Sequence, residues 1–136
     1  MGRRPDHVFQ PQGKPSSGAS EPLGDSVAAS FGDGMLRVYG PAGDVRRAWK
    51  AGAKGFVVLA YSGDGRRIAG GGNDGRVSVA ESNAGRELAS FSAHAAKIDA
   101  LAVSRDGSVI ATAAGSDAAA FRTAGGVRLF TLWIPA

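Results

Sequence analysis

The sequence repeats itself about every 42 residues, and this repeat constrains the fold more than any other feature does. Residues 56–94 align with residues 98–133 almost without gaps. The two segments carry an aspartate at the same place, since Asp64 and Asp106 are 42 positions apart. A repeat of this length indicates a fold assembled from similar supersecondary units, each burying its apolar surface against its neighbours.

A third copy precedes these two, at residues 27–49. Here Asp33 corresponds to Asp74 and Tyr39 corresponds to Ala80, each pair being 41 positions apart. The sequence therefore predicts three copies of one unit.

Short apolar or alternating runs within each copy predict β-strands, and the glycine-bearing segments between them predict turns. Glycine supplies 21 of the 136 residues, about twice its usual share of roughly 7%. The runs VVLAY (57–61) and ALAV (100–103) are almost continuously apolar, so we expect inner strands buried on both faces. In the second copy the predicted strands are Phe56–Tyr61, Arg67–Gly71, Arg76–Ala80 and Glu87–Phe91. No stretch between glycines keeps the period of about 3.6 residues that predicts a helix.

The glycine-rich stretch SGDGRRIAGGGNDG (62–75) does not match the phosphate-binding motifs. A Walker loop requires a lysine after its last glycine, and none follows here. The dinucleotide pattern fails because Ile68 occupies its third glycine position. We therefore expect the glycines of GDG and NDG to take positive φ angles in two tight hairpin turns.

Residues 1–25 are rich in proline, glycine and serine, and two interpretations stay open for them. They form either a flexible tail, or an irregular first strand at HVFQPQGK (7–14) followed by a long loop at PSSGASEPLGD (15–25). The remaining residues, 26–136, divide into three units at about 26–50, 54–93 and 94–133.

These features resemble the WD-repeat (WD40) family of β-propellers, whose blades are four-stranded sheets of about 40 to 45 residues. The segment SAHAAKIDALAVSRDG (92–107) places His94 at the family's histidine position and SRDG in the turn that follows. Asp33, Asp74 and Asp117 occupy the family's turn-aspartate position. The resemblance implies an all-β fold, a partial β-propeller of about three four-stranded antiparallel blades that is not a closed ring alone.

The Trp-Asp pair that names the family is absent from all three copies. Its position reads YG at 39–40, AE at 80–81 and TA at 123–124. Of the hydrogen-bonded network that the family builds inside a blade, the resemblance implies only one set, His94 with Asp117 and Thr112 in the third copy. We expect these residues, with Asp33 and Asp74, to hold turns in place.

No catalytic, cofactor or metal site is expected. The only other histidine, His7, lies in the N-terminal segment, and no carboxylate cluster flanks either histidine. The turn aspartates lie about 40 residues apart on equivalent turns, which does not suit a paired acid and base. Trp49 and Trp133 are expected to end fourth strands, in core or blade-edge positions.

Closed propellers typically have four to eight blades, so three blades leave an apolar face and unpaired strand edges at each end. Three sources of the missing blades are open: a longer chain, a second copy, or a different subunit. The expected partners are thus proteins, or a homo-oligomer that completes the propeller.

The composition bears on where the protein is located. The chain has no cysteine and therefore needs no oxidising compartment. No apolar run approaches the roughly 18 residues of a membrane-spanning helix, so no membrane partner is expected and the expected location is cytoplasmic.

The resemblance and the missing catalytic constellation favour a non-enzymatic protein-protein interaction scaffold. The alternative, favoured by a net charge of +4 and a pI near 10.0, is a basic nucleic-acid or ribonucleoprotein-associated subunit. An enzyme that uses the propeller loops as an active site has the least support. The polar side chains expected to meet a partner are Arg46, Arg47, Arg66, Arg67, Arg76 and Arg86.

Overall fold

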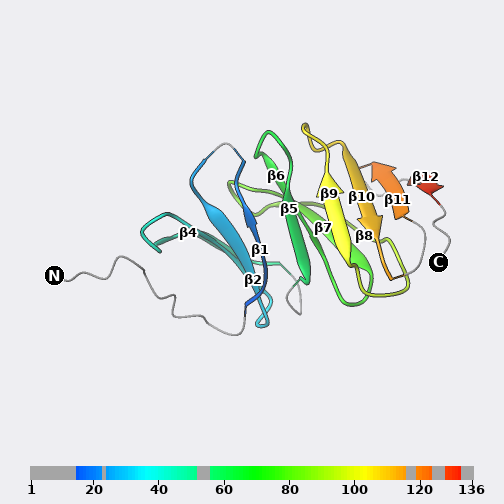
Figure 1. Ribbon diagram of the computed structural model, residues 1–136. Helices are drawn as coiled ribbons and strands as arrows, with labels where there is room; N and C mark the ends of the chain where they lie inside the picture. Colours follow the sequence, from blue (N-terminus) through cyan, green and yellow to red (C-terminus); the bar gives the residue numbers. More distant parts are fainter. Residues whose placement is uncertain (1–14, 23, 52–55, 116–118, 124–127, 133–136) are drawn as a thin grey trace.

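The computed structural model describes residues 15–22, 24–51, 56–115, 119–123 and 128–132, which form three four-stranded antiparallel sheets (Figure 1). Sheet A contains β1 (Pro15–Ser20), β2 (Val27–Phe31), β3 (Met35–Tyr39) and β4 (Val45–Lys50). Sheet B contains β5 (Val58–Tyr61), β6 (Arg67–Gly71), β7 (Arg76–Glu81) and β8 (Glu87–Ser92). Sheet C contains β9 (Ala100–Val103), β10 (Val109–Ala113), β11 (Ala119–Thr123) and β12 (Arg128–Leu132).

Each sheet is a meander in which strands adjacent in sequence are adjacent in space. The first strands of the three sheets, β1, β5 and β9, lie side by side, while β4 and β12 lie at opposite sides of the molecule (Figure 1). The predicted fold class is confirmed: the chain is all-β, and its three sheets do not close into a ring. The described residues include no helix that could span a membrane.

Strand β1 differs from the loop that the composition of residues 15–25 predicts. Serine, glycine and proline have low strand propensity, but β1 pairs along its length with β2, from Ser17 opposite Ser30 to Ser20 opposite Val27. Its small side chains also allow close approach to sheet B, where Ser17 Oγ donates a hydrogen bond to Phe56 O at 2.9 Å. Main-chain pairing therefore overrides composition here, while residues 1–14 lie outside the described part of the chain.

The expectation that inner strands are buried on both faces is wrong for β9. Ala100 and Ala102 are exposed, whereas Leu101 and Val103 are half-buried against sheet B. Strand β5, between two sheets, is better covered but still only half-buried at Val58–Ala60. An inner strand is covered on both faces only when a sheet lies on each side, and no described sheet follows sheet C.

Two apolar clusters hold the sheets together, and each fills the space between two neighbouring sheets. The cluster between sheets A and B contains Ala28, Leu36, Val38, Tyr61, Ile68 and Ala80. The cluster between sheets B and C contains Ala69, Val77, Val79, Ala93, Ile98 and Ile110. Because strand side chains alternate between faces, Ile68 and Ala69 enter different clusters from adjacent positions of β6.

The prediction of positive φ angles is confirmed for Gly65 and Gly75 and is wrong for Gly63, the first glycine of GDG. Gly65 has φ +74° and Gly75 has φ +84°, a region that side chains other than glycine rarely adopt. Gly75 also lies against the link between β8 and β9, because its carbonyl oxygen accepts hydrogen bonds from Ala93 N at 2.8 Å and His94 N at 3.2 Å. The turn between β6 and β7 is therefore bonded to the link that leads from sheet B to sheet C.

Candidate interaction site

A serine and an aspartate build the turn between β5 and β6. Ser62 Oγ donates to Asp64 Oδ1 at 2.7 Å and accepts from Arg67 N at 3.0 Å. The same carboxylate oxygen accepts from Arg66 N at 3.0 Å. Ser62 is fully buried, so these bonds fix the turn from the inside.

The turn between β9 and β10 repeats this arrangement 42 residues later. Ser104 Oγ donates to Asp106 Oδ1 at 3.1 Å and accepts from Val109 N at 2.9 Å. The two turns are joined across the sheets, because Asp64 N donates to the carbonyl oxygen of Arg105 at 2.8 Å. They form one continuous ledge, which we call the Ser-Asp ledge and define as residues 62–67 and 104–109.

Asp64 and Asp106 align in the sequence repeat, but no role was predicted for either of them, and neither Ser62 nor Ser104 was predicted as a site residue. The signal that identifies them is S-x-D-G at a spacing of 42, because both hydroxyls fall at the same place in the repeat. A serine two positions before an aspartate reaches that carboxylate within a tight turn.

The hydrogen bonds of the ledge lower the pKa of both carboxyls. The Ser62 hydroxyl contributes most to the lowered pKa of Asp64, followed by the amide of Arg66. The pKa of Asp106 is lowered first by the hydroxyl and then by the amide of Ser108. Both carboxylates are thus held in the charged form as acceptors.

These lowered pKa values predict a specific loss of stability in acid. A carboxyl with a lower pKa in the folded state stabilises the fold above its unfolded pKa of about 3.9, and the contribution disappears as the pH falls through the folded pKa. We expect the double variant Asp64→Asn with Asp106→Asn to be less stable than the wild type at pH 7. The difference should narrow below about pH 4, where the wild-type carboxyls become protonated. Urea unfolding from pH 7 to pH 3 measures it, and a difference that stays constant over this range contradicts the prediction.

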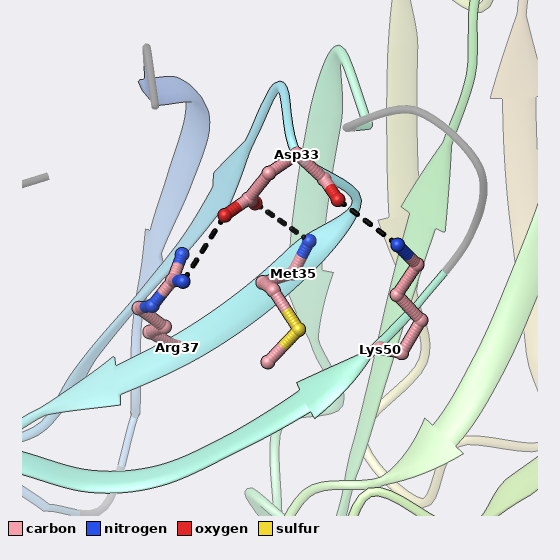
Figure 2. Close-up of polar contacts among 4 residues, drawn as sticks. All are labelled: Asp33, Met35, Arg37 and Lys50. Atoms are coloured by element: carbon pink, nitrogen blue, oxygen red, sulfur yellow. Dashed lines mark hydrogen bonds and ion pairs between the residues drawn. The ribbon is translucent and has the colours of Figure 1, made fainter. Parts of the chain in front are cut away.

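Asp33 holds the turn between β2 and β3 (Figure 2). Its Oδ1 accepts from Met35 N at 2.9 Å, its Oδ2 from Arg37 Nη2 at 3.1 Å, and its carbonyl oxygen from Lys50 Nζ at 3.1 Å. The amide of Met35 and then the guanidinium of Arg37 lower the pKa of Asp33. The turn is therefore tied to both β3 and β4.

The other two aspartates of the predicted turn set have different outcomes. Asp74 Oδ1 accepts from Arg76 N at 3.1 Å in the turn between β6 and β7, the equivalent turn of sheet B. Asp117 lies outside the described residues.

His94 lies in the link between β8 and β9, and its Nε2 is 2.9 Å from Thr112 Oγ1 on β10. Thr112 is 2% exposed, so the pair lies inside the interface between sheets B and C. Two of the three residues of the predicted network are thus in contact, and the third is Asp117. Among the described residues no three histidine, aspartate or glutamate side chains gather as metal ligands would.

Two of the six candidate arginines are already paired with carboxylates. Arg46 Nη1 lies 2.8 Å from Asp25 Oδ1, and the guanidinium of Arg86 binds Glu81 through two bonds of 3.1 and 3.0 Å. These pairs are exposed and add little stability, but they neutralise both cations.

The other candidate arginines differ in how available they are. Arg67 Nη1 donates to Gly107 O at 3.2 Å, across sheets B and C, and Arg76 Nη2 donates to Ser90 Oγ at 3.0 Å. Arg47 lies near the Tyr61 hydroxyl. The pKa of Tyr61 is raised, first by burial and then by the charge of Glu21, and Arg47 offsets part of this rise. Only Arg66, on the exposed edge of the Ser-Asp ledge, uses its main chain alone in the contacts described above.

The described side chains carry no net positive charge. They include ten of the sixteen lysines and arginines and ten of the twelve aspartates and glutamates, so their formal charges cancel. The excess of +4 belongs to residues whose side chains lie outside the described part. The described side chains therefore give no net positive charge to attract a phosphate backbone.

Trp49 occupies a structural position between sheets A and B. It is half-buried against the cluster that contains Leu36 and Val38, and it leaves no room for a side chain at Gly85. The cavity beside it, lined by Trp49, Phe56 and Glu87 among others, has about 20 Å³, which is room for roughly one water molecule. Trp133 lies outside the described residues.

The fold defines the class of protein. Three four-stranded antiparallel meanders, packed face to face with their first strands adjacent, are blades of a β-propeller. The sequence model of the family described as WD domain, G-beta repeat matches residues 85–119, a segment that runs from the turn before β8 into β11. Residues 85–119 therefore match one WD40 repeat, which begins just before the last strand of sheet B and continues into sheet C.

Solved structures show the same fold. The WD40 repeats of RRP9 and the structure of U3-55K each match 90% of this chain with a TM-score of 0.80 and 15% identity, over 39% and 40% of their own chains. The computationally designed Ika4 protein matches 96% of this chain with a TM-score of 0.76 and 22% identity, over 79% of its own chain. This chain thus spans about two fifths of the first two structures. No curated protein sequence matches it.

Proposed function

We propose that this chain is a non-enzymatic protein-protein interaction scaffold, and that a protein partner binds the Ser-Asp ledge. The observation that carries the proposal is the construction of the ledge, in which duplicated hydrogen bonds and a cross-sheet main-chain bond hold two neighbouring turns in fixed positions. Turns held on a rigid frame present their exposed side chains with little loss of conformational entropy on binding.

Arg66 and Arg105 are the partner-facing side chains of this ledge. Both are exposed, and they project from neighbouring turns, one from each of two sheets. The carboxylates of Asp64 and Asp106 are engaged within their own turns, so the guanidinium groups are the polar atoms available to an acidic or carbonyl-rich surface of a partner.

The test compares the two arginines of the Ser-Asp ledge with Arg76, which lies at the other end of sheet B. The immobilised wild-type chain is expected to retain a defined protein from cell extract, and Arg66→Ser with Arg105→Ser should reduce the retained amount at least about tenfold, the effect of losing roughly 1.4 kcal/mol of binding free energy. Arg76→Ser is the control, because its guanidinium is bound to Ser90 at the other end of sheet B. Equal retention by all variants, or none by the wild type, contradicts the proposal.

Nucleic-acid binding is the second candidate, favoured by the net charge of +4. The charges of the described side chains cancel, so the net charge that favours this candidate comes from the remaining residues. Binding through phosphate contacts falls steeply as salt concentration rises, so an affinity that is unchanged between 50 and 200 mM salt, roughly the range over which such contacts weaken, eliminates this candidate.

A further inference from the structure

The interface between sheets A and B and the interface between sheets B and C use the same positions of the repeat. Sheet A packs on sheet B through Ala28, Leu36 and Val38. Sheet B packs on sheet C through Ala69, Val77 and Val79, the positions 41 residues later. We call this side of each sheet its following face, because it contacts the next sheet in the sequence.

The opposite side, which we call the receiving face, also uses equivalent positions. On sheet B it presents Ile68 and Ala80 to sheet A, and on sheet C it presents Ile110 to sheet B. The same positions on sheet A are Val27 and Tyr39, 41 residues before Ile68 and Ala80. Sheet A therefore has a receiving face, but no described sheet precedes it.

The receiving face of sheet A carries exposed apolar side chains. Val27, Tyr39 and Val45 form one row across the sheet, since Val27 is opposite Tyr39 and Tyr39 is opposite Val45. Val27 is 45% exposed and Val45 is 54% exposed, whereas Ile68, the counterpart of Val27, is only 3% exposed. Among the described residues Leu88 is the only other large hydrophobic side chain that is exposed.

The same face carries a polar group that lacks a partner. Arg37 lies on it two positions before Tyr39, with its guanidinium carbon 4.7 Å from the centre of the Phe31 ring. Its Nη2 binds Asp33, as Figure 2 shows, but its Nη1 is buried without a hydrogen-bond acceptor. Burying this donor costs free energy that no described acceptor offsets.

The following face of sheet C complements this surface in size. Ala111 is the counterpart of Ala69, and Ala100 stands 42 residues after Val58, in place of a larger side chain. The receiving face of sheet A has the opposite change, with Tyr39 in place of Ala80. Small side chains on one face thus match large ones on the other, as packing at interior density requires.

We propose that the receiving face of sheet A binds the following face of sheet C from a second copy of this chain. The contact continues the two established interfaces by one more step of the same repeat. Because two such contacts form between two copies, the dimer closes into a ring of six sheets, within the four to eight blades of closed propellers. The contact uses sheet faces rather than the Ser-Asp ledge, so it goes beyond the function proposed above.

Sedimentation of the purified chain at micromolar concentration tests the proposal. The expected particle has twice the mass of the 13.8 kDa chain. Val27→Glu with Val45→Glu should convert it to the single-chain mass, because charges in the row oppose burial. Leu88→Glu, at an exposed position on β8 outside the row, is the matched control and should leave the doubled mass unchanged. A wild-type chain that sediments at the single-chain mass overturns the proposal.

Cysteine cross-linking tests which faces meet, since the chain has no cysteine of its own. The counterparts of Val27 and Ala111, Ile68 and Ala28, lie in one apolar cluster. Val27→Cys with Ala111→Cys should therefore give a covalent dimer under mild oxidation, and Leu88→Cys with Ala111→Cys should not. A covalent dimer from Val27→Cys alone indicates that sheet A meets sheet A, which overturns the proposal.

The two proposals fail separately. Retention of a protein partner is measured on the Val27→Glu, Val45→Glu variant and on the wild type in parallel. A variant that sediments as a single chain and keeps its partner supports the ring and the ledge together. A chain that binds its partner through Arg66 and never dimerises overturns the ring alone.

Discussion

Gly75→Ala is expected to lower the free energy of unfolding by about 3 kcal/mol or more. Gly75 has φ +84°, which costs an L side chain about 1–2 kcal/mol. A methyl group here would also overlap the carbonyl oxygen of His94 and lie 2.8 Å from that of Ala96. Both obstacles are main-chain atoms, so relieving the overlap requires the link between β8 and β9 to move.

Gly115→Ala separates the two causes. Gly115 has φ +59°, and an added methyl group there meets nothing within 4 Å. We therefore expect only the conformational cost, about 1 kcal/mol. Urea unfolding of both variants measures the difference, and equal losses of stability contradict the overlap at Gly75.

Leu36→Ala is expected to lower the free energy of unfolding by about 2–5 kcal/mol. Leu36 is 2% exposed in the cluster between sheets A and B, where it packs with Val38 and Ile68. The exchange removes buried apolar surface and leaves a cavity that the two sheets fill only by shifting together.

Leu88→Ala is the matched control, since it deletes the same atoms from a side chain that is 39% exposed on β8. Its expected cost is under about 1 kcal/mol. Calorimetric unfolding compares the two variants. If both variants lose the same free energy of unfolding, the packing between sheets A and B does not contribute to stability as predicted.

The strands of the second copy show how accurately local sequence patterns predict strand bounds. Arg67–Gly71 was predicted with its observed bounds, and the other three strands differ at their ends by one or two residues. Glycine turns and the alternation of apolar and polar residues depend on only a few neighbouring residues, so they can be recognised in the sequence. The predicted all-β class and the resemblance to WD repeats follow from the same local signals, repeated three times.

The Ser-Asp ledge could be predicted from the sequence only in part. Its two S-x-D-G turns are visible as a repeat, but the hydrogen bond from Asp64 N to Arg105 O joins residues about 40 positions apart and depends on how sheets B and C pack. The same holds for the candidate arginines. Arg46 and Arg86 read as free cations in the sequence, and only the fold brings Asp25 and Glu81 to them.

Strand β1 and the two exposed valines of sheet A, Val27 and Val45, show which features depend on neighbouring residues and which depend on tertiary packing. The sequence by itself determined the repeated unit, its strands and its glycine turns, because these depend on neighbouring residues. Only the tertiary structure decided that PSSGAS pairs as a strand, and that Val27 and Val45 face outward while Ile68 is buried. Strand pairing and side-chain burial depend on which strand or sheet lies alongside, and only the packing of the three sheets decides that.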